Sequence, residues 1–131
     1  MAERMYHSIA AGSSLPADGQ RHATPILAAD LAALLTRGFE LRLQGLYHLS
    51  GAERTSPHRF ACELATAMGG RWSDSSCVGR PATSVLGETS LSSKQARRTL
   101  KMSTPLLREG LVRFVAQARA RRPANCHEMA A

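Results

Sequence analysis

The sequence is short of aromatic residues and of long apolar runs. Its 131 residues include three Phe, two Tyr and one Trp, so a core has to be built mainly from Leu and Ala. No apolar run approaches the roughly 18 residues that a membrane-spanning helix needs. The N-terminus also lacks the charged start and continuous apolar stretch of a secretory signal. We therefore expect a small soluble domain of marginal stability.

Catalytic and cofactor motifs are absent as well. No Gly-Lys-Ser/Thr follows a Gly-rich turn, so a phosphate-binding loop is not indicated. His58 and Cys62 lie four residues apart on a predicted helix, but nothing at a suitable spacing completes a zinc site or a nucleophilic centre. We expect no enzyme, no metal and no cofactor. The three cysteines are scattered, which favours free thiols in a reducing cytoplasm over disulfides.

Positive charge is concentrated in one segment. Residues 94–122 carry nine basic side chains and one acid, a net charge of +8. The other 102 residues carry eight basic and nine acidic side chains, a net charge of −1. A block of this size is typical of a surface that meets a polyanion or water.

Three Ser/Thr-Pro pairs predict helix starts. The hydroxyl can cap the free amides of a first turn, and Pro suits the first helical position because its missing N–H has no partner there. Apolar residues at helical spacing follow each pair. We predict helices over 25–37, 57–68 and 105–121, and a short one over 94–101. Phe39, Leu41 and Leu43 alternate with polar residues, which predicts a short β element near 39–49.

The predicted fold class is therefore mainly α, and composition divides the chain into five parts. The N-terminal part is small and polar, and residues after the second helix are rich in Ser, Thr and Gly. The parts are a mobile arm over 1–23, a small helical core over 24–70, a linker over 71–93, a basic helical unit over 94–122 and a tail over 123–131.

One short stretch of the basic unit resembles a known DNA-binding motif. Residues 91–107 read LSSKQARRTLKMSTPLL, and this pattern is similar to the helix-turn-helix of excisionase-type DNA-binding proteins and related antitoxins. Ala96 and Leu100 would pack inward, and Ser103 or Thr104 would cap a recognition helix. Arg97 stands where the family has a second Ala, and Lys101 stands at a turn position where Gly or Asn is usual.

This resemblance implies a non-enzymatic, nucleic-acid-binding protein that regulates transcription or assists a DNA transaction. Thr104 to Arg108 would approach bases or phosphates in the groove. The residues expected to bind nucleic acid are Lys94, Arg97, Arg98, Lys101, Ser103, Thr104, Arg108, Arg119 and Arg122. The predicted partner is nucleic acid, DNA before RNA, and a homodimer is a further option. The alternative is a protein-interaction module, an inhibitor or assembly factor that docks a basic amphipathic helix on an acidic protein.

Overall fold

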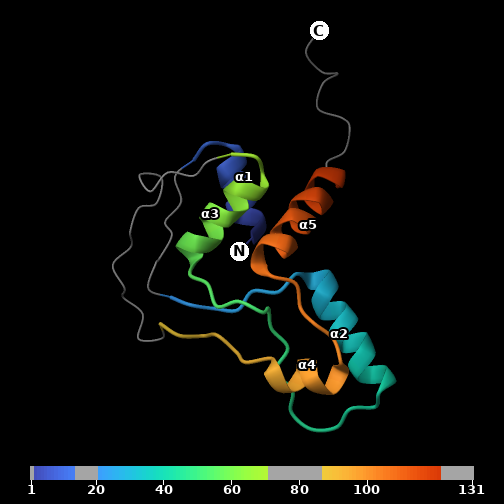
Figure 1. Cartoon of the computed structure of the whole chain (residues 1–131). Coiled ribbons are helices and arrows are strands. Elements are labelled where there is room, and N and C mark those ends of the chain that lie inside the picture. The colour runs from blue at the N-terminus through green and yellow to red at the C-terminus, as the bar shows by residue number, and fades with distance from the viewer. Residues whose placement is uncertain (1, 14–20, 71–86, 122–131) are drawn as a thin grey trace.

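The structure, a computed structural model, describes residues 2–13, 21–70 and 87–121. These residues hold five helices and no strand of a sheet, which confirms the mainly α fold class (Figure 1). The helices are α1 (Ala2–Ala10), α2 (Ala28–Glu40), α3 (Pro57–Ala67), α4 (Lys94–Leu100) and α5 (Leu107–Ala120). None of the helices described is long and apolar enough to cross a membrane.

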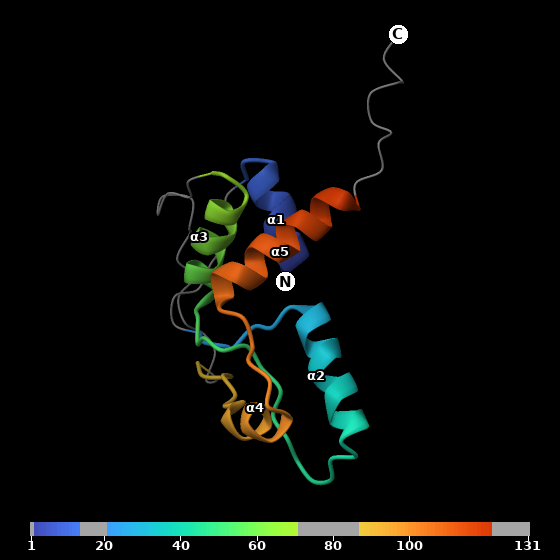
Figure 2. The same ribbon diagram turned by 45° about the vertical axis from the view of Figure 1, so that its right-hand side comes forward.

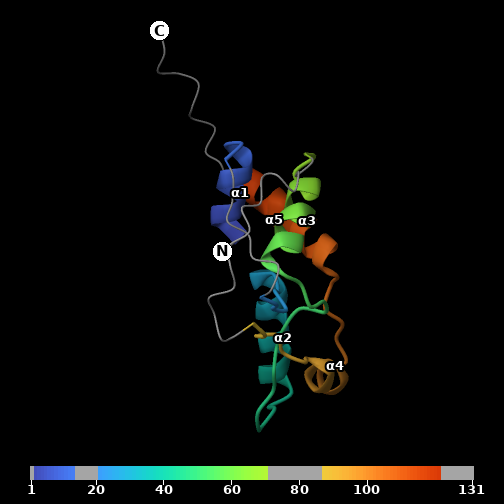
Figure 3. The same ribbon diagram turned by 90° about the vertical axis from the view of Figure 1, so that its left-hand side faces the viewer.

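The helices form two groups at opposite ends of the molecule, as all three ribbon views show (Figures 1, 2 and 3). The three-helix group consists of α1, α3 and α5, and the two-helix group consists of α2 and α4. The first group buries Met5, Tyr6, Phe60, Leu64, Leu111 and Val115 against one another. The second buries Leu34, Ala96 and Leu100. Each group thus has its own small apolar core.

Extended segments between the two helix groups connect them through hydrogen bonds. The His22 N–H donates to the Gly87 carbonyl at 2.8 Å, and Ala23 and Thr55 exchange two backbone hydrogen bonds of 2.9 and 2.8 Å. The Ser50 hydroxyl donates to the Leu91 carbonyl at 2.9 Å. Three segments far apart in sequence therefore meet in the narrow region between the two helix groups, which we call the waist. There the backbone N–H and C=O groups bond to one another instead of to water.

An ion pair at this waist shifts the pKa of Glu88. The Arg54 guanidinium donates to Glu88 Oε2 at 2.8 Å from Nε and 2.5 Å from Nη2. This hydrogen bonding, with further hydrogen bonds from the Ser90 hydroxyl and backbone amide, lowers the pKa of the Glu88 carboxyl to about 2.

One of the three Ser/Thr-Pro starts is where the pattern placed it. The Ser56 hydroxyl accepts from the Arg59 N–H at 3.2 Å, and α3 begins at Pro57. The other two helices begin later than predicted, at Ala28 and Leu107. The Thr24 hydroxyl instead accepts from the Leu91 N–H at 3.1 Å, so tertiary contacts use the group that would have capped a helix.

Two other expectations are wrong. Residues 2–10, assigned to a mobile arm, form α1, whose Met5 and Tyr6 are buried against α3 and α5. The β element near 39–49 is absent, because α2 continues through Gly38 to Glu40 and no neighbouring backbone pairs with residues 41–49. Leu43, Tyr47 and Leu49 pack on the core of the two-helix group instead. Residues 71–86 of the predicted linker, 14–20 of the arm and 122–131 lie outside the described residues.

Candidate ligand pocket and basic cleft

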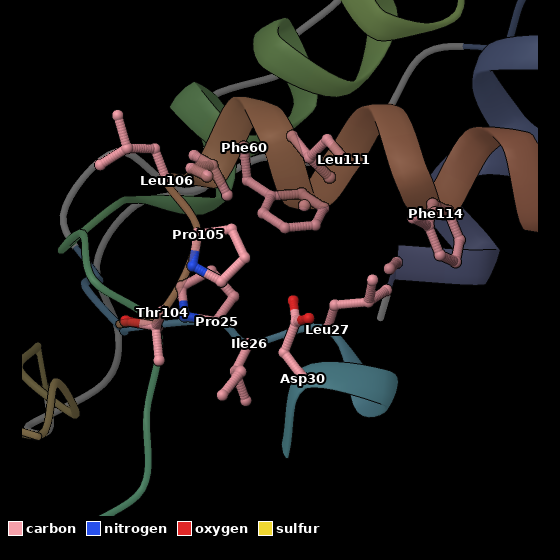
Figure 4. A pocket seen from close by; sticks show the side chains of 14 residues that line it. Pro25, Ile26, Leu27, Asp30, Phe60, Thr104, Pro105, Leu106, Leu111 and Phe114 are labelled. Carbon is pink, nitrogen blue, oxygen red and sulfur yellow. The ribbon is translucent and has the colours of Figure 1, made fainter. Parts of the chain in front are cut away.

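A pocket of ≈200 Å³ opens where the three-helix group faces the start of α2 (Figure 4). Phe60 and Leu111 cover it from the side of α3 and α5, and Phe114 closes one end. Its lining is completed mainly by Pro25, Ile26, Leu27, Asp30, Thr104, Pro105, Leu106 and Gly110. The walls are mostly apolar, with few polar groups, as is usual for sites that bind a small organic ring.

Asp30 supplies the charge at this pocket. Its carboxylate points from α2 towards α5 and is only 15% exposed (Figure 4). Arg113 Nη1 donates to Asp30 Oδ1 at 2.6 Å, a charge-assisted bond that joins the two helices. The Asp30 carboxylate thus presents a hydrogen-bond acceptor beside the apolar wall.

Gly110 leaves an open space in the same wall. A Cβ atom added at this position would meet no heavy atom within 4 Å. A glycine inside a helix lowers the stability of the fold by roughly 0.5–1 kcal/mol relative to an alanine at the same position. The fold therefore does not require glycine here, and the space beside it belongs to the pocket.

Two carboxylates occupy the N-terminus of α5. The Leu107 N–H donates to Glu53 Oε2 at 2.6 Å, and the Leu106 N–H donates to Glu109 Oε2 at 3.2 Å. These groups satisfy free amides and complement the positive end of the helix dipole. A phosphate at this helix end would meet two negative charges, so the geometry does not favour the groove contact expected for Thr104 to Arg108.

A second feature is a basic cleft along α4, lined by Lys94, Arg97, Arg98, Lys101, Met102 and Ser103. The four cations repeat at helical spacing on the face opposite Ala96 and Leu100, which are buried against α2. Among the residues that the structure describes, no acid forms an ion pair with any of the four. Arg97 Nε is buried without a hydrogen-bond partner. Within the described ranges, the cleft is thus a positive stripe without a paired acid.

The structure brings together five of the nine residues expected to bind nucleic acid. These five are Lys94, Arg97, Arg98, Lys101 and Ser103. Thr104 is buried, with 7% of its surface exposed, and Arg108 lies on the exposed side of α5. Arg119 donates to the Met68 carbonyl at 3.0 Å, and Arg122 lies outside the described residues.

The two helices of the proposed helix-turn-helix belong to different groups. α4 packs against α2, and α5 packs against α3. The local turn is present, since Lys101 has φ 53 and ψ 38, the left-handed conformation that the pattern places there. The DNA-binding motif itself stays a prediction.

Sequence reasoning missed the pocket. Its Asp30–Arg113 pair joins residues 83 positions apart, and no local pattern indicates that they meet. Phe60 and Phe114 belong to the apolar faces of their helices, and that pattern predicts burial in a core rather than a pocket wall. In the described part of the chain no three His, Cys, Asp or Glu side chains are placed to hold a metal ion.

Comparison with known proteins places the fold but gives no family. No protein-family model matches the chain, and no curated protein matches it. Solved structures do match, and three of them are enzymes in complex with NAD or NADP. At 11–16% sequence identity, the likeness shows a shared fold alone.

Two of these structures are Bacillus anthracis enzymes. The dTDP-4-dehydrorhamnose reductase, solved with NADP, has a TM-score of 0.77 at 16% identity over 89% of this chain and 43% of its own. The dTDP-glucose 4,6-dehydratase, solved with NAD, has a TM-score of 0.75 at 11% identity over 92% and 39%. The Bordetella bronchiseptica enzyme WbmH, solved with NAD⁺, has a TM-score of 0.65 at 15% identity over 93% and 40%. The chain thus spans about two-fifths of each neighbour's length.

Proposed function

We propose that this chain is the sugar-nucleotide-binding part of an oxidoreductase fold that modifies nucleotide-linked sugars. The observation that carries the proposal is the match of 89–93% of this chain to three enzymes that were solved with NAD or NADP. Two of them are named for dTDP-linked sugars. Nearly the whole chain shares its fold with enzymes that are named for two different reactions. A role in binding the part that their substrates have in common therefore explains the likeness better than a role in either reaction.

The described residues do not fit a dinucleotide. Dinucleotide sites of this kind of enzyme use a parallel sheet whose first strand leads through a Gly-rich turn into a helix. The described part of the chain has isolated bridges only, and the sequence contains no Gly-x-Gly-x-x-Gly. The shared two-fifths are therefore best interpreted as the part that faces the other substrate, the sugar nucleotide.

The pocket between α2, α3 and α5 is the proposed contact point. Its ≈200 Å³ is below the range of roughly 300–1,000 Å³ for a drug-sized ligand, so it suits one ring rather than a whole nucleotide sugar. Phe60 and Phe114 offer aromatic surfaces against which a base or sugar ring can pack. Asp30 would accept a hydrogen bond from a ring N–H or hydroxyl. The rest of the ligand would extend beyond the pocket.

Calorimetric titration of the chain with dTDP-glucose and, separately, with NADP tests this proposal. We expect dTDP-glucose to bind and NADP alone not to bind. Gly110→Met should fill the pocket and weaken dTDP-glucose binding about tenfold, a loss of roughly 1.4 kcal/mol. Ala116→Met, on an exposed part of the same helix, is the matched control and should bind like the unmodified chain. Equal affinities of the two variants, or no binding of dTDP-glucose, would refute the proposal.

A second candidate function is nucleic-acid binding along the α4 cleft. The observation that favours it is the stripe of four cations without a described acidic partner. From Lys94 to Lys101 the stripe extends about 10 Å, at 1.5 Å per residue, which suits several consecutive phosphates of a backbone better than one. Such contacts would be independent of base sequence.

Salt dependence distinguishes this candidate from the protein-interaction alternative. If the cleft holds phosphates, affinity for a DNA duplex should fall steeply with salt, and Arg98→Ala should reduce the slope by about one. A basic helix that prefers an acidic protein would leave DNA binding weak at low salt as well. Either candidate agrees with a cytoplasmic location, which stays a prediction.

A further inference from the structure

The pocket wall that α5 forms has a gap at Gly110. Leu107, Gly110 and Phe114 lie on one face of α5, because residues three and four apart are neighbours on a helix surface. All three line the pocket. The outer two carry large apolar side chains, whereas a Cβ atom at Gly110 would meet nothing within 4 Å outside α5. We call this gap between Leu107 and Phe114 the notch.

The fold itself gives no reason for a glycine at the notch. Gly110 lies inside the regular helix, and its φ is not in the left-handed region that favours glycine. No neighbouring backbone approaches it closely enough to exclude a side chain. Alanine would fit there and would favour the helix. The notch is therefore best explained by a ligand group that uses the space.

Asp30 faces the notch from the other side of the pocket. It belongs to α2, and its carboxylate points towards α5 (Figure 4). Arg113 bonds to Oδ1 of this carboxylate, so the orientation of the group is fixed while Oδ2 is left to accept a hydrogen bond from a ligand. A ring bound here would thus present one edge to an acceptor and the opposite edge to an apolar gap.

A thymine ring has this arrangement of groups. Its N3–H is a donor on one edge, and its C5 methyl group lies on the opposite edge. Its two faces are apolar and can pack against Phe60 and Phe114. A hexose would instead bring several hydroxyls against walls that offer them few partners, and a buried hydroxyl without a partner is costly.

We propose that the pocket binds the thymine base of a nucleotide sugar, with the C5 methyl group in the notch and N3–H donating to Asp30. This inference rests on the proposed function. Gly110 is then a specificity-determining residue. The thymine methyl group leaves water and fills the notch, whereas uracil leaves it empty. N1, which carries the deoxyribose, remains free to point out of the pocket.

Calorimetric titration of the chain with dTDP and with dUDP, which differ only in the C5 methyl group, tests this inference. We expect dTDP to bind about fourfold more tightly, the ratio that one buried methyl group gives. Gly110→Ala places a methyl group of the protein in the notch, so this variant should lose affinity for dTDP and bind both nucleotides equally. Gly38→Ala makes the same change inside α2, outside this pocket and without a close contact, and should keep the fourfold preference.

Asp30→Asn separates the two edges of the ring. It alters the contact that thymine and uracil share, so it should weaken both nucleotides alike and leave their ratio unchanged. Three results would overturn the inference: equal affinities of the unmodified chain, a preference that persists in Gly110→Ala, or a preference that disappears in Asp30→Asn.

Failure of the inference is distinguishable from failure of the proposed function. Binding of dTDP-glucose without a preference for dTDP over dUDP would leave the proposed function standing and remove the role of the notch. No binding of dTDP-glucose or of either diphosphate would remove both.

Discussion

Two glycines of this chain have opposite environments, and their substitution checks the local geometry. A Cβ at Gly110 would meet nothing within 4 Å, whereas a Cβ at Gly51 would lie 1.9 Å from the Pro25 carbonyl oxygen. We expect Gly110→Ala to raise the free energy of unfolding by about 0.5–1 kcal/mol through helix propensity. Gly51→Ala should lower it by roughly 1–3 kcal/mol, because backbone must move. Denaturant unfolding of both variants measures this, and a destabilised Gly110→Ala protein would contradict the open pocket.

Glu88 gives the waist a pH dependence of known sign. Its pKa in the folded protein is about 2, below the ordinary value of 4.5, so the folded state favours the charged carboxylate. The stability that this group adds is complete above pH 4.5 and disappears as the pH falls towards 2. We expect the difference in unfolding temperature between the unmodified protein and Glu88→Gln to shrink over that range. A difference that stays constant would mean that the Arg54 contact does not form.

Residue-scale prediction from sequence worked where the cause was local. The Ser56-Pro57 start is confirmed because both side chains act within the first turn of α3. Lys101 adopts the positive φ that its place in the turn requires. Thr24 and Thr104 do not cap helices. Leu91, distant in sequence, bonds to the Thr24 hydroxyl, and α5 is capped by the distant Glu53 and by Glu109 of its own first turn.

At the scale of elements, α4 has a buried Ala/Leu face and a basic face, and Arg97 lies at their border. Its Nε is buried without a partner, which costs free energy, and Ala has the higher helix propensity. We expect Arg97→Ala to stabilise the protein by up to about 1 kcal/mol. Arg98→Ala removes an exposed cation from the same helix and should leave stability almost unchanged. Thermal unfolding compares the two, and a clear loss of stability in Arg97→Ala would reveal an ion pair at that side chain.

The elements themselves were predictable only where an apolar stripe was long. Helices α2, α3 and α5 follow from their periodicity, although two of them start up to three residues late. α1 was missed because it is only nine residues long, although Met5, Tyr6 and Ile9 follow helical spacing; burial of Met5 and Tyr6 by distant helices stabilises it. The alternation at 39–43 predicted a strand, but no partner backbone is available there. Which helix packs on which was beyond local pattern: α4 packs against α2, and α5 packs against α3.

On the scale of the whole molecule, two small apolar cores are joined by a hydrogen-bonded waist, and the pocket lined by Asp30, Phe60 and Phe114 opens where they face each other. The basic cleft was predictable, since the charge block is local in sequence. The pocket was not, because its walls come from α2, α3, α5 and the segment before α5. The charge distribution of the sequence indicated a polyanion partner. The three-dimensional structure shows in addition that the chain shares its fold with two enzymes named for dTDP-linked sugars.

Nuclear magnetic resonance tests most directly the proposal that the chain binds a sugar nucleotide between its two helix groups. Amide shifts of the isotope-labelled chain are followed while dTDP-glucose is added. We expect the largest, saturable changes at Asp30, Phe60 and Phe114, with residues 94–101 of the basic cleft little affected. No saturable change, or changes confined to residues 94–101, would contradict the claim.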